Sequence, residues 1–230
     1  SWGFTILSLQ PCLIKYIRNP TENPQKKGKI TMIDHFIFDF DGTISDSYPI
    51  FIQIFHEIAQ KRKLPFHASD SELDRMLKIT LKSGFDFLGW DKVCEWNLFL
   101  DEFYKHQANH ALDFQAFPEA KELLKRISAK GKKSYIYTHS GDIVKVMLEN
   151  MGLLHYFDFI LDSSYGFPGK PKPDALLFFL NKFGMEPLSC MMIGDRPIDA
   201  QAGMNAGMVG CLWDVDGRYS DFCADVTVQS

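Results

Sequence analysis

The chain has 230 residues, of which 46% are hydrophobic and 23% charged, and its formal net charge is −4 at pH 7. A chain of this size buries a large core, either as one domain or as a domain with an insertion. Acids and bases are interspersed, which excludes a basic nucleic-acid-binding face, and no apolar run approaches the roughly 20 residues that span a bilayer. Five scattered cysteines without a Cys-x-x-Cys pair are typical of a reducing compartment, so we expect a cytoplasmic protein.

Residues 1–31 differ in character from the rest of the chain. Their moderately apolar first half contains Pro11, and the polar stretch that follows contains two more prolines. They lack the basic segment that precedes the apolar part of a signal peptide. Because Met32 stands directly before the first predicted strand, we interpret residues 1–31 as an N-terminal extension outside the catalytic unit. A packed accessory segment is the alternative.

The first predicted strand, Phe36–Phe40, leads two carboxylates, Asp39 and Asp41, into a turn at Gly42. Side chains alternate along a strand, so both acids project from the same side as the strand ends. Holding two negative charges together costs free energy unless a cation or a shared proton relieves them. The pair therefore predicts a metal and phosphoryl-transfer site. An ordinary hairpin turn at Asp-Gly is the alternative.

From Asp34 onward, short apolar segments alternate with amphipathic ones. The predicted strands are Phe36–Phe40, Ser134–Thr138, Phe159–Leu161, Met191–Gly194 and Val209–Leu212. The predicted helices between them are Pro118–Lys130, Gly141–Met151, Asp174–Phe183 and Pro197–Ala206. Apolar strands separated by helices indicate an α/β fold with a Rossmann-like parallel sheet, in which ligands bind beyond the carboxyl ends of the strands.

The stretch between Ser47 and about Phe114 contains no convincing strand. Its apolar residues recur at helical spacing, and the predicted helices are Pro49–Lys63, Asp70–Lys82 and Asp86–His110. We predict that residues 47–113 form an inserted α-helical cap domain over a catalytic core of residues 32–46 and 114–230. A lid of this kind excludes water and selects the substrate. Candidates for its site-facing surface are Arg75, Lys78, Lys82 and Ser83–Gly84, with a solvated helix face as the alternative.

Polar residues also follow later strands of the predicted sheet. Thr138 and His139 offer a hydroxyl and an imidazole before a helix, Lys170 lies in a proline-bound loop, and Asp195 ends a strand four residues before Asp199. Each has an ordinary structural alternative when taken alone. Thr138 would be a helix N-cap and Lys170 a solvated loop lysine, while Asp195 and Asp199 would be turn and cap residues. Their order and spacing together favour a site.

In these motifs the chain resembles the haloacid dehalogenase superfamily of phosphohydrolases, over roughly Asp34 to Leu212. The matching motifs are Asp39-Phe-Asp-Gly-Thr43, Thr138, Lys170 within Lys-Pro-Lys-Pro, and Gly194-Asp-Arg-Pro-Ile-Asp199. The continuation Ala200-Gln-Ala-Gly203-Met-Asn-Ala-Gly207 and the run Asp46-Ser-Tyr-Pro49 are similar to the phosphoglycolate-phosphatase-like branch, which has a helical cap.

The resemblance implies a Mg²⁺-dependent phosphatase that forms an aspartyl-phosphate. Asp39 is then the nucleophile and Asp41 the general acid and base. Asp39, the Asp41 carbonyl, Asp195 and, as an auxiliary ligand, Asp199 hold Mg²⁺. Thr43, Thr138, His139 and Lys170 bind the substrate or its phosphoryl group, although a structural role for His139 and a contribution from Lys172 in place of Lys170 remain open.

The expected substrate is a small phosphorylated metabolite, either phosphoglycolate-like or a sugar phosphate. Neither a nucleic acid nor a membrane is an expected partner, and a monomer or weak homodimer is expected. Asp41 argues against a dehalogenase, because a halide leaving group needs no proton. A phosphomutase of the β-phosphoglucomutase type and a non-catalytic binding module on the same fold are the alternative functions.

Overall fold

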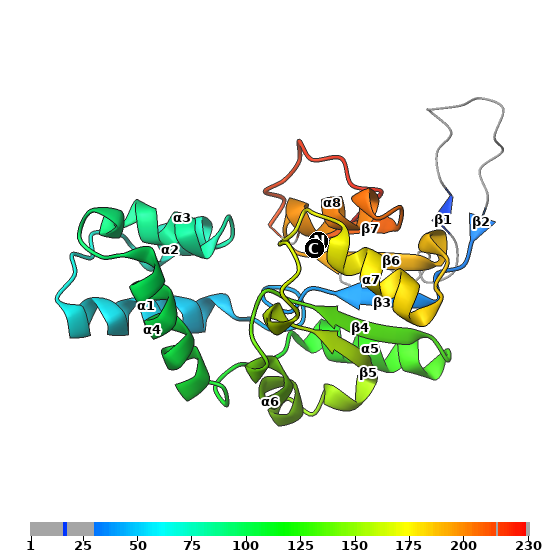
Figure 1. Ribbon diagram of the computed structural model, residues 1–230, viewed down its shortest axis with the longest axis horizontal. Coiled ribbons are helices and arrows are strands. Elements are labelled where there is room, and N and C mark those ends of the chain that lie inside the picture. Colours follow the sequence, from blue (N-terminus) through cyan, green and yellow to red (C-terminus); the bar gives the residue numbers. More distant parts are fainter. Residues whose placement is uncertain (1–15, 18–29, 215, 229–230) are drawn as a thin grey trace, which may run out of the picture.

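The protein is built on a six-stranded parallel sheet with helices on both faces (Figure 1). The computed structural model describes residues 16–17, 30–214 and 216–228. The spatial order of the strands is β5-β4-β3-β6-β7-β8. Their bounds are β3 His35–Phe38, β4 Lys133–Tyr137, β5 Phe157–Leu161, β6 Cys190–Gly194, β7 Val209–Trp213 and β8 Val226–Val228. The predicted α/β fold with a parallel sheet is therefore confirmed.

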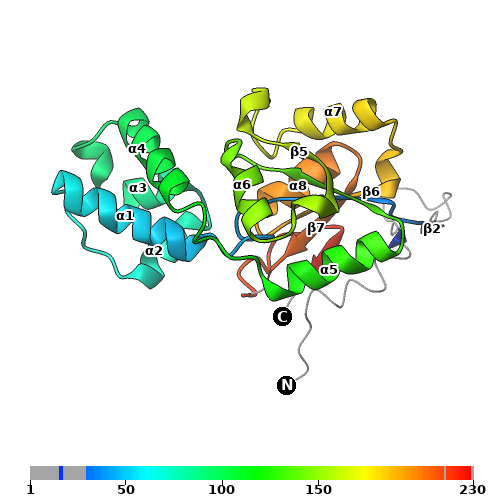
Figure 2. The ribbon, with the colours of Figure 1, turned by 90° about the horizontal axis from the view of Figure 1, so that it is seen from below.

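Alternation along the strands divides the core into two apolar clusters. In β3, Phe36 and Phe38 face one cluster and Ile37 faces the other. Helices α5 (Pro118–Ala129) and α6 (Ile143–Asn150) bury their apolar residues in the first cluster. Helices α7 (Asp174–Phe183) and α8 (Pro197–Asn205) bury theirs in the second, and Figure 2 shows α5 and α7 on opposite sides of the strands. Burial on both faces explains why the strands read as continuous apolar runs.

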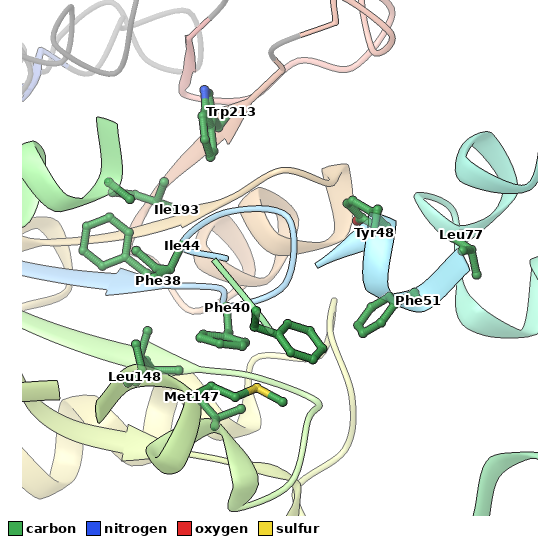
Figure 3. Packing of buried hydrophobic residues seen from close by; sticks show 14 of the residues in the cluster. Phe38, Phe40, Ile44, Tyr48, Phe51, Leu77, Met147, Leu148, Ile193 and Trp213 are labelled. Atoms are coloured by element: carbon green, nitrogen blue, oxygen red, sulfur yellow. The ribbon is translucent and has the colours of Figure 1, made fainter. Parts of the chain in front are cut away.

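A separate group of helices lies beyond the carboxyl ends of the strands (Figure 1). Its members are α1 Tyr48–Arg62, α2 Asp70–Leu77, α3 Leu81–Phe87 and α4 Trp96–Asn109. Aromatic rings fill its interior: Phe55 stacks on Trp90, and Phe99 contacts both. The apolar cluster beside the sheet continues into this group through Phe51, as Figure 3 shows. We call these four helices the helical unit.

Within the helical unit, two of the predicted helices were too long. The expected helix Asp70–Lys82 is interrupted after Leu77, and α3 begins behind an N-cap at Thr80, whose hydroxyl accepts from the Ser83 N–H. The expected helix Asp86–His110 is wrong over its first part. Gly89 adopts φ +72°, a conformation that ends a helix, and a 3₁₀ turn at Trp90–Lys92 separates α3 from α4.

The edge strand β8 was not predicted, and β3 is shorter than predicted. Strand β8 has three residues, too few for a pattern, and pairing with β7 defines it. Strand β3 ends at Phe38 because the Phe40 carbonyl leaves the ladder and accepts from Ile44 and Ser45 in a turn. Asp39 still donates its N–H to the Ile193 carbonyl at 2.8 Å, so it stays anchored to β6.

Two chain segments connect the sheet to the helical unit, and they run side by side. Asp46 donates its N–H to the Gln115 carbonyl at 2.9 Å, and Phe117 donates to the Ile44 carbonyl at 3.0 Å. The turn before them requires glycine at position 42, where φ is +79° and a Cβ atom would lie 2.4 Å from Asp195 Oδ2. Because Gly42 lies so close to Asp195, the segment that follows β3 packs against the end of β6.

Most of the predicted N-terminal extension, residues 1–31, lies outside the described residues. Its described parts, β1 (Tyr16–Ile17) and β2 (Ile30–Thr31), pair as an antiparallel two-stranded sheet. None of the helices in the described part of the chain is long and apolar enough to cross a membrane.

Candidate active site

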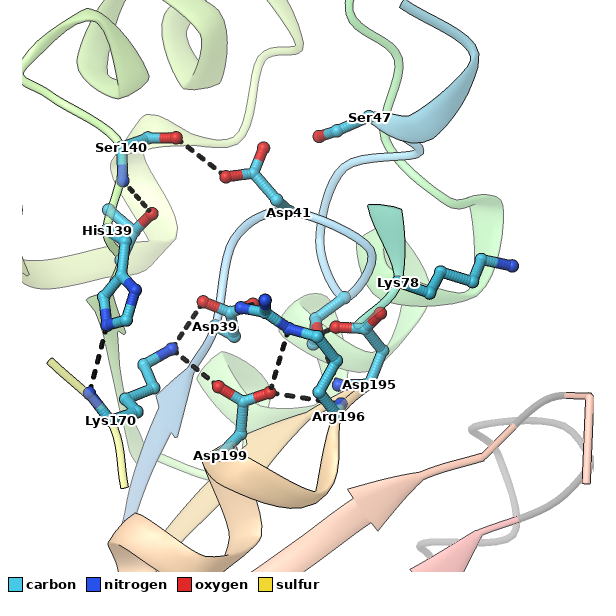
Figure 4. Close-up of polar contacts among 12 residues, drawn as sticks. Asp39, Asp41, Ser47, Lys78, His139, Ser140, Lys170, Asp195, Arg196 and Asp199 are labelled. Carbon is cyan, nitrogen blue, oxygen red and sulfur yellow. Dashed lines mark hydrogen bonds and ion pairs between the residues drawn. The ribbon is translucent and has the colours of Figure 1, made fainter. Parts of the chain in front are cut away.

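Four segments meet at the carboxyl ends of β3, β4 and β6 (Figure 4). Asp39 and Asp41 follow β3, and His139 and Ser140 follow β4. Lys170 enters from the segment between β5 and α7. The turn after β6 and the start of α8 supply the remaining groups, which are Asp195, Arg196 and Asp199. The expected edge of the sheet thus carries the polar residues.

Lys170 joins two of these carboxylates at the centre of the site. Its Nζ donates to Asp39 Oδ1 at 2.6 Å and to Asp199 Oδ1 at 2.7 Å, and all three side chains are buried. Burial alone would lower the pKa of Lys170, but the charges of Asp199 and Asp39 raise it above its usual value, so the side chain is a permanent cation. Lys172, the alternative, is exposed.

Asp195 is held from two directions. Tyr48, the first residue of α1, donates its hydroxyl to Asp195 Oδ2 at 2.7 Å. Thr43 accepts from the Asp195 N–H at 3.0 Å, and its hydroxyl lies 3.4 Å from Asp195 Oδ1. Burial raises the pKa of the Asp195 carboxyl, and the negative charges of Asp199 and Asp39 contribute to the rise.

Three carboxylates form a group that fits a divalent cation. One oxygen from each of Asp39, Asp195 and Asp199 lies within 4.8 Å of the other two. Asp39 Oδ2 is buried without a hydrogen-bond partner among the described residues, which leaves a carboxylate oxygen that a cation would satisfy. The predicted ligands Asp39, Asp195 and Asp199 are therefore close together, whereas the Asp41 side chain is outside this group.

The Asp41 carboxyl points away from the metal-binding group toward Ser140 (Figure 4). Ser140 donates its hydroxyl to Asp41 Oδ2 at 2.7 Å, while Asp41 Oδ1 is buried without a partner. Burial and then the negative charge of Asp39 raise the pKa of Asp41 to about 6, against the effect of the Ser47 and Ser140 hydroxyls. A carboxyl with this pKa exchanges a proton near neutral pH, as an acid–base group must.

The two predicted residues after β4 have local partners. Thr138 Oγ1 accepts from the Ser140 N–H at 3.0 Å, and His139 Nε2 accepts from the Lys170 N–H at 3.2 Å. Burial, followed by the charges of Lys170 and Arg196, lowers the pKa of His139 to about 4, so its ring is neutral. His139 thus fixes the segment that carries Lys170.

Comparison with known proteins identifies the family. The sequence model of the haloacid dehalogenase-like hydrolases matches residues 36–212. The chain belongs to this family.

Two sequence relatives of the chain are named as phosphatases. The chain is 27% identical to the phosphoglycolate phosphatase of Aliivibrio fischeri over 181 residues, which cover 74% of this chain and 79% of that protein. It is 23% identical to the pyrophosphatase PpaX of Bacillus velezensis over 188 residues, or 80% and 85% of the two chains. The fold matches a family hydrolase from Deinococcus radiodurans with a TM-score of 0.68 at 24% identity, covering 86% and 91% of the chains.

Three groups in this hydrolase site were not predicted as site residues. Arg196 lies inside the quoted motif, directly after Asp195, and Ser140 lies two residues after Thr138. Tyr48 belongs to the run that marks the entry to the helical unit. A polar residue next to each motif was the available signal, but the direction of each side chain depends on turns that the sequence pattern does not specify.

Proposed function

We propose that this hydrolase is a Mg²⁺-dependent phosphatase of a small phosphorylated metabolite that acts through an aspartyl-phosphate. One observation carries the proposal: Asp39 keeps one buried oxygen free while Lys170 holds the other. A nucleophilic carboxylate needs this combination of a fixed orientation and a lone pair that no hydrogen bond occupies. Asp41 provides the matching proton donor, with a pKa raised to about 6 by burial and by Asp39.

In the proposed first step, Asp39 Oδ2 attacks the phosphorus atom of the ester. The bond from phosphorus to the alcohol oxygen breaks, and protonated Asp41 gives its proton to that oxygen. Lys170 and Thr138 hold the phosphoryl group, whose developing negative charge requires fixed donors and cations. The products of this step are the free alcohol and a phosphorylated Asp39.

In the second step, Asp41 acts in the opposite sense. It is now a carboxylate, and it takes a proton from a water molecule that attacks the phosphorus atom. The bond between phosphorus and Asp39 breaks, which releases inorganic phosphate and restores both carboxyl groups. Ser140 holds Asp41 in place during both transfers through its 2.7 Å hydrogen bond.

The proposed metal ligands are Asp39, the Asp41 carbonyl and Asp195, with Asp199 as an auxiliary group. Oxygen ligands of this kind suit Mg²⁺, which usually binds a few carboxylates together with phosphate oxygens. Bound there, Mg²⁺ supplies positive charge that offsets the carboxylates and stabilises the phosphoryl oxygens. The pairwise separations within 4.8 Å support this assignment.

The helical unit would serve as the cap, residues 47–113, over the core of residues 32–46 and 114–230. Support comes from the paired connections that join it to the sheet and from the contact of Tyr48 with Asp195. The named phosphoglycolate phosphatase and pyrophosphatase relatives favour a small phosphate ester, with phosphoglycolate-like compounds and sugar phosphates as the first to test.

Replacing Asp39 by Asn tests this function. We expect the D39N variant to lose phosphate release by about 1,000-fold or more, because an amide is a poor nucleophile. The measurement is phosphate release from a panel of phosphate esters with Mg²⁺, alongside a search for isomeric products. Asp158→Asn is the matched control, since Asp158 pairs with Lys133 in an exposed ion pair. Activity in D39N that persists without deamidation would falsify the assignment of Asp39 as the nucleophile. Isomer formation without phosphate release would indicate a mutase.

A further inference from the structure

The guanidinium of Arg196 is a cation in the site for which no hydrogen bond to another described residue is found. Its side chain is 16% exposed, and its Nε atom is buried without a hydrogen-bond partner. Its ion-pair contacts, from Nη2 to Asp39 Oδ2 and from Nε to Asp199 Oδ2, are both 4.0 Å long, which is beyond hydrogen-bonding distance. A guanidinium offers five donors in a fixed plane, and buried donors without acceptors cost free energy.

The backbone fixes where this side chain starts. The Arg196 N–H donates to Asp199 Oδ2 at 3.1 Å, and Pro197 follows as the first residue of α8. The guanidinium then lies over the free oxygen of Asp39, on the side opposite Lys170, as Figure 4 shows. Two buried atoms without partners, Asp39 Oδ2 and Arg196 Nε, therefore belong to neighbouring side chains of opposite charge.

A ligand that satisfies both side chains has a defined chemistry. It must accept hydrogen bonds from a guanidinium and present an electrophilic atom to a carboxylate oxygen. A phosphoryl group does both, because its oxygens accept in pairs from arginine while its phosphorus atom faces the nucleophile. A divalent cation on the carboxylates would satisfy Asp39, but it cannot accept hydrogen bonds and so would leave the Arg196 donors unsatisfied.

We propose that Arg196 binds the transferring phosphoryl group directly and, with Lys170, encloses it between two cations. The inference rests on the proposed phosphatase function and adds a substrate-binding residue to it. Arg196 contacts the phosphoryl oxygens on the Asp39 Oδ2 side, and Lys170 approaches from the Oδ1 side. This role requires the planar, two-pronged donor of arginine, so lysine at position 196 replaces the charge but not the geometry.

Inorganic phosphate is the probe for this role, because it is the product of the reaction and needs no turnover. Isothermal titration calorimetry would measure its Kd in Mg²⁺-saturated protein for wild type, Arg196→Gln and Arg196→Lys. We expect Arg196→Gln to raise this Kd by about 10- to 100-fold, as for loss of a charge-assisted hydrogen bond, and Arg196→Lys to raise it less. Arg126→Gln, which removes an arginine from a surface ion pair on α5, is the matched control.

A parallel titration with MgCl₂ distinguishes two roles for Arg196: direct binding of phosphate, and neutralisation of the charge of the carboxylates. If Arg196 only neutralises the carboxylates, Arg196→Gln will bind Mg²⁺ more tightly and leave the phosphate Kd unchanged, which overturns the proposal. Equal losses of phosphate and Mg²⁺ binding in both variants also overturn it, because that pattern means a collapsed site. Phosphate binding weakened in Arg196→Gln and partly kept in Arg196→Lys supports it. A wild-type protein that hydrolyses no phosphate ester contradicts the proposed function instead.

Discussion

At the scale of single residues, the different roles that we propose for Asp39 and Asp41 follow from the side chains that contact them. A lysine fixes one carboxyl, whereas a serine hydroxyl fixes the other. Burial, followed by the negative charge of Asp39, favours the protonated form of Asp41. In the proposed mechanism, the same type of side chain therefore serves as a nucleophile in one position and as a proton donor in the other.

Ser140 offers a test of the proposed role of Asp41 as the proton donor. Replacing Ser140 by Ala frees the Asp41 carboxyl, so proton delivery to a poor leaving group becomes less efficient. We expect kcat/KM for an alkyl phosphate to fall by about 10- to 100-fold, and that for p-nitrophenyl phosphate, whose leaving group needs no proton, by less than about threefold. The ratio kcat/KM is the right measure because it excludes the hydrolysis of phosphorylated Asp39.

The matched control is Ser134→Ala, which changes a buried serine near the start of β4, the strand that precedes Ser140. Equal losses on the two substrates would contradict the assignment of Ser140 to proton transfer. They would mean instead that the hydroxyl supports the general shape of the site.

At the scale of elements, ion pairs join the helical unit to the segment after β7. Lys78 Nζ lies 3.1 Å from Asp216, and Arg218 lies 3.2 Å from Asp74. Lys78 also lies over the ring of Tyr48, which contacts Asp195. Each exposed or half-exposed pair contributes only about 0–1 kcal/mol, which is small against the stability of the fold but would matter if the helical unit acts as the proposed cap.

Removing this connection should alter substrate binding more than folding. For the double variant Asp216→Asn, Arg218→Gln we expect a KM increase of about two- to fivefold and a Tm change of less than about 3 °C, because the lost pairs are solvated. KM should also depend less on NaCl in this variant, since salt screens such pairs in the wild type. The control is Lys133→Gln, which breaks an exposed ion pair between β4 and β5, away from the helical unit. An unchanged KM would show that the pairs do not influence the cap.

At the scale of the whole molecule, we expect stability and the proposed metal binding to be coupled through the site. Burial raises the pKa of Asp41 to about 6 and also raises the pKa of Asp195, so both favour the protonated form in the folded state. Their contribution to stability is present below the ordinary pKa of 3.8 and is lost as the pH rises through about 6 for Asp41 and about 7 for Asp195. A bound cation reverses this trend, because it binds the ionised carboxylates.

The expected signature is therefore a Mg²⁺ effect that grows with pH. With chelator, ionisation of Asp41 should cost about 1–2 kcal/mol, less than for a fully buried residue, since Asp41 is only half-buried. Mg²⁺ should raise the Tm more at about pH 7.5 than at about pH 5. Thermal melts of wild type and Asp195→Asn with chelator or Mg²⁺ measure both effects. A Mg²⁺ effect that is the same at both pH values, or that persists in Asp195→Asn, would contradict the coupling.

The sequence determined the sheet and the order of its catalytic motifs. Apolar runs buried on both faces predicted the strands from β3 to β7, and the Asp39, Lys170 and Asp195 motifs predicted the edge at which they meet. The helix breaks at Thr80 and Gly89 and the edge strand β8 were missed, because short local turns and pairing partners leave little periodic signal.

Only the tertiary structure decided which polar side chains touch. It placed Lys170 rather than Lys172 between Asp39 and Asp199, turned His139 toward the backbone of Lys170, and brought Arg196 and Ser140 beside the two acids. Sequence spacing specifies the order of residues along a strand or helix. The direction of a side chain in a turn depends instead on the backbone dihedral angles and on segments more than a hundred residues away.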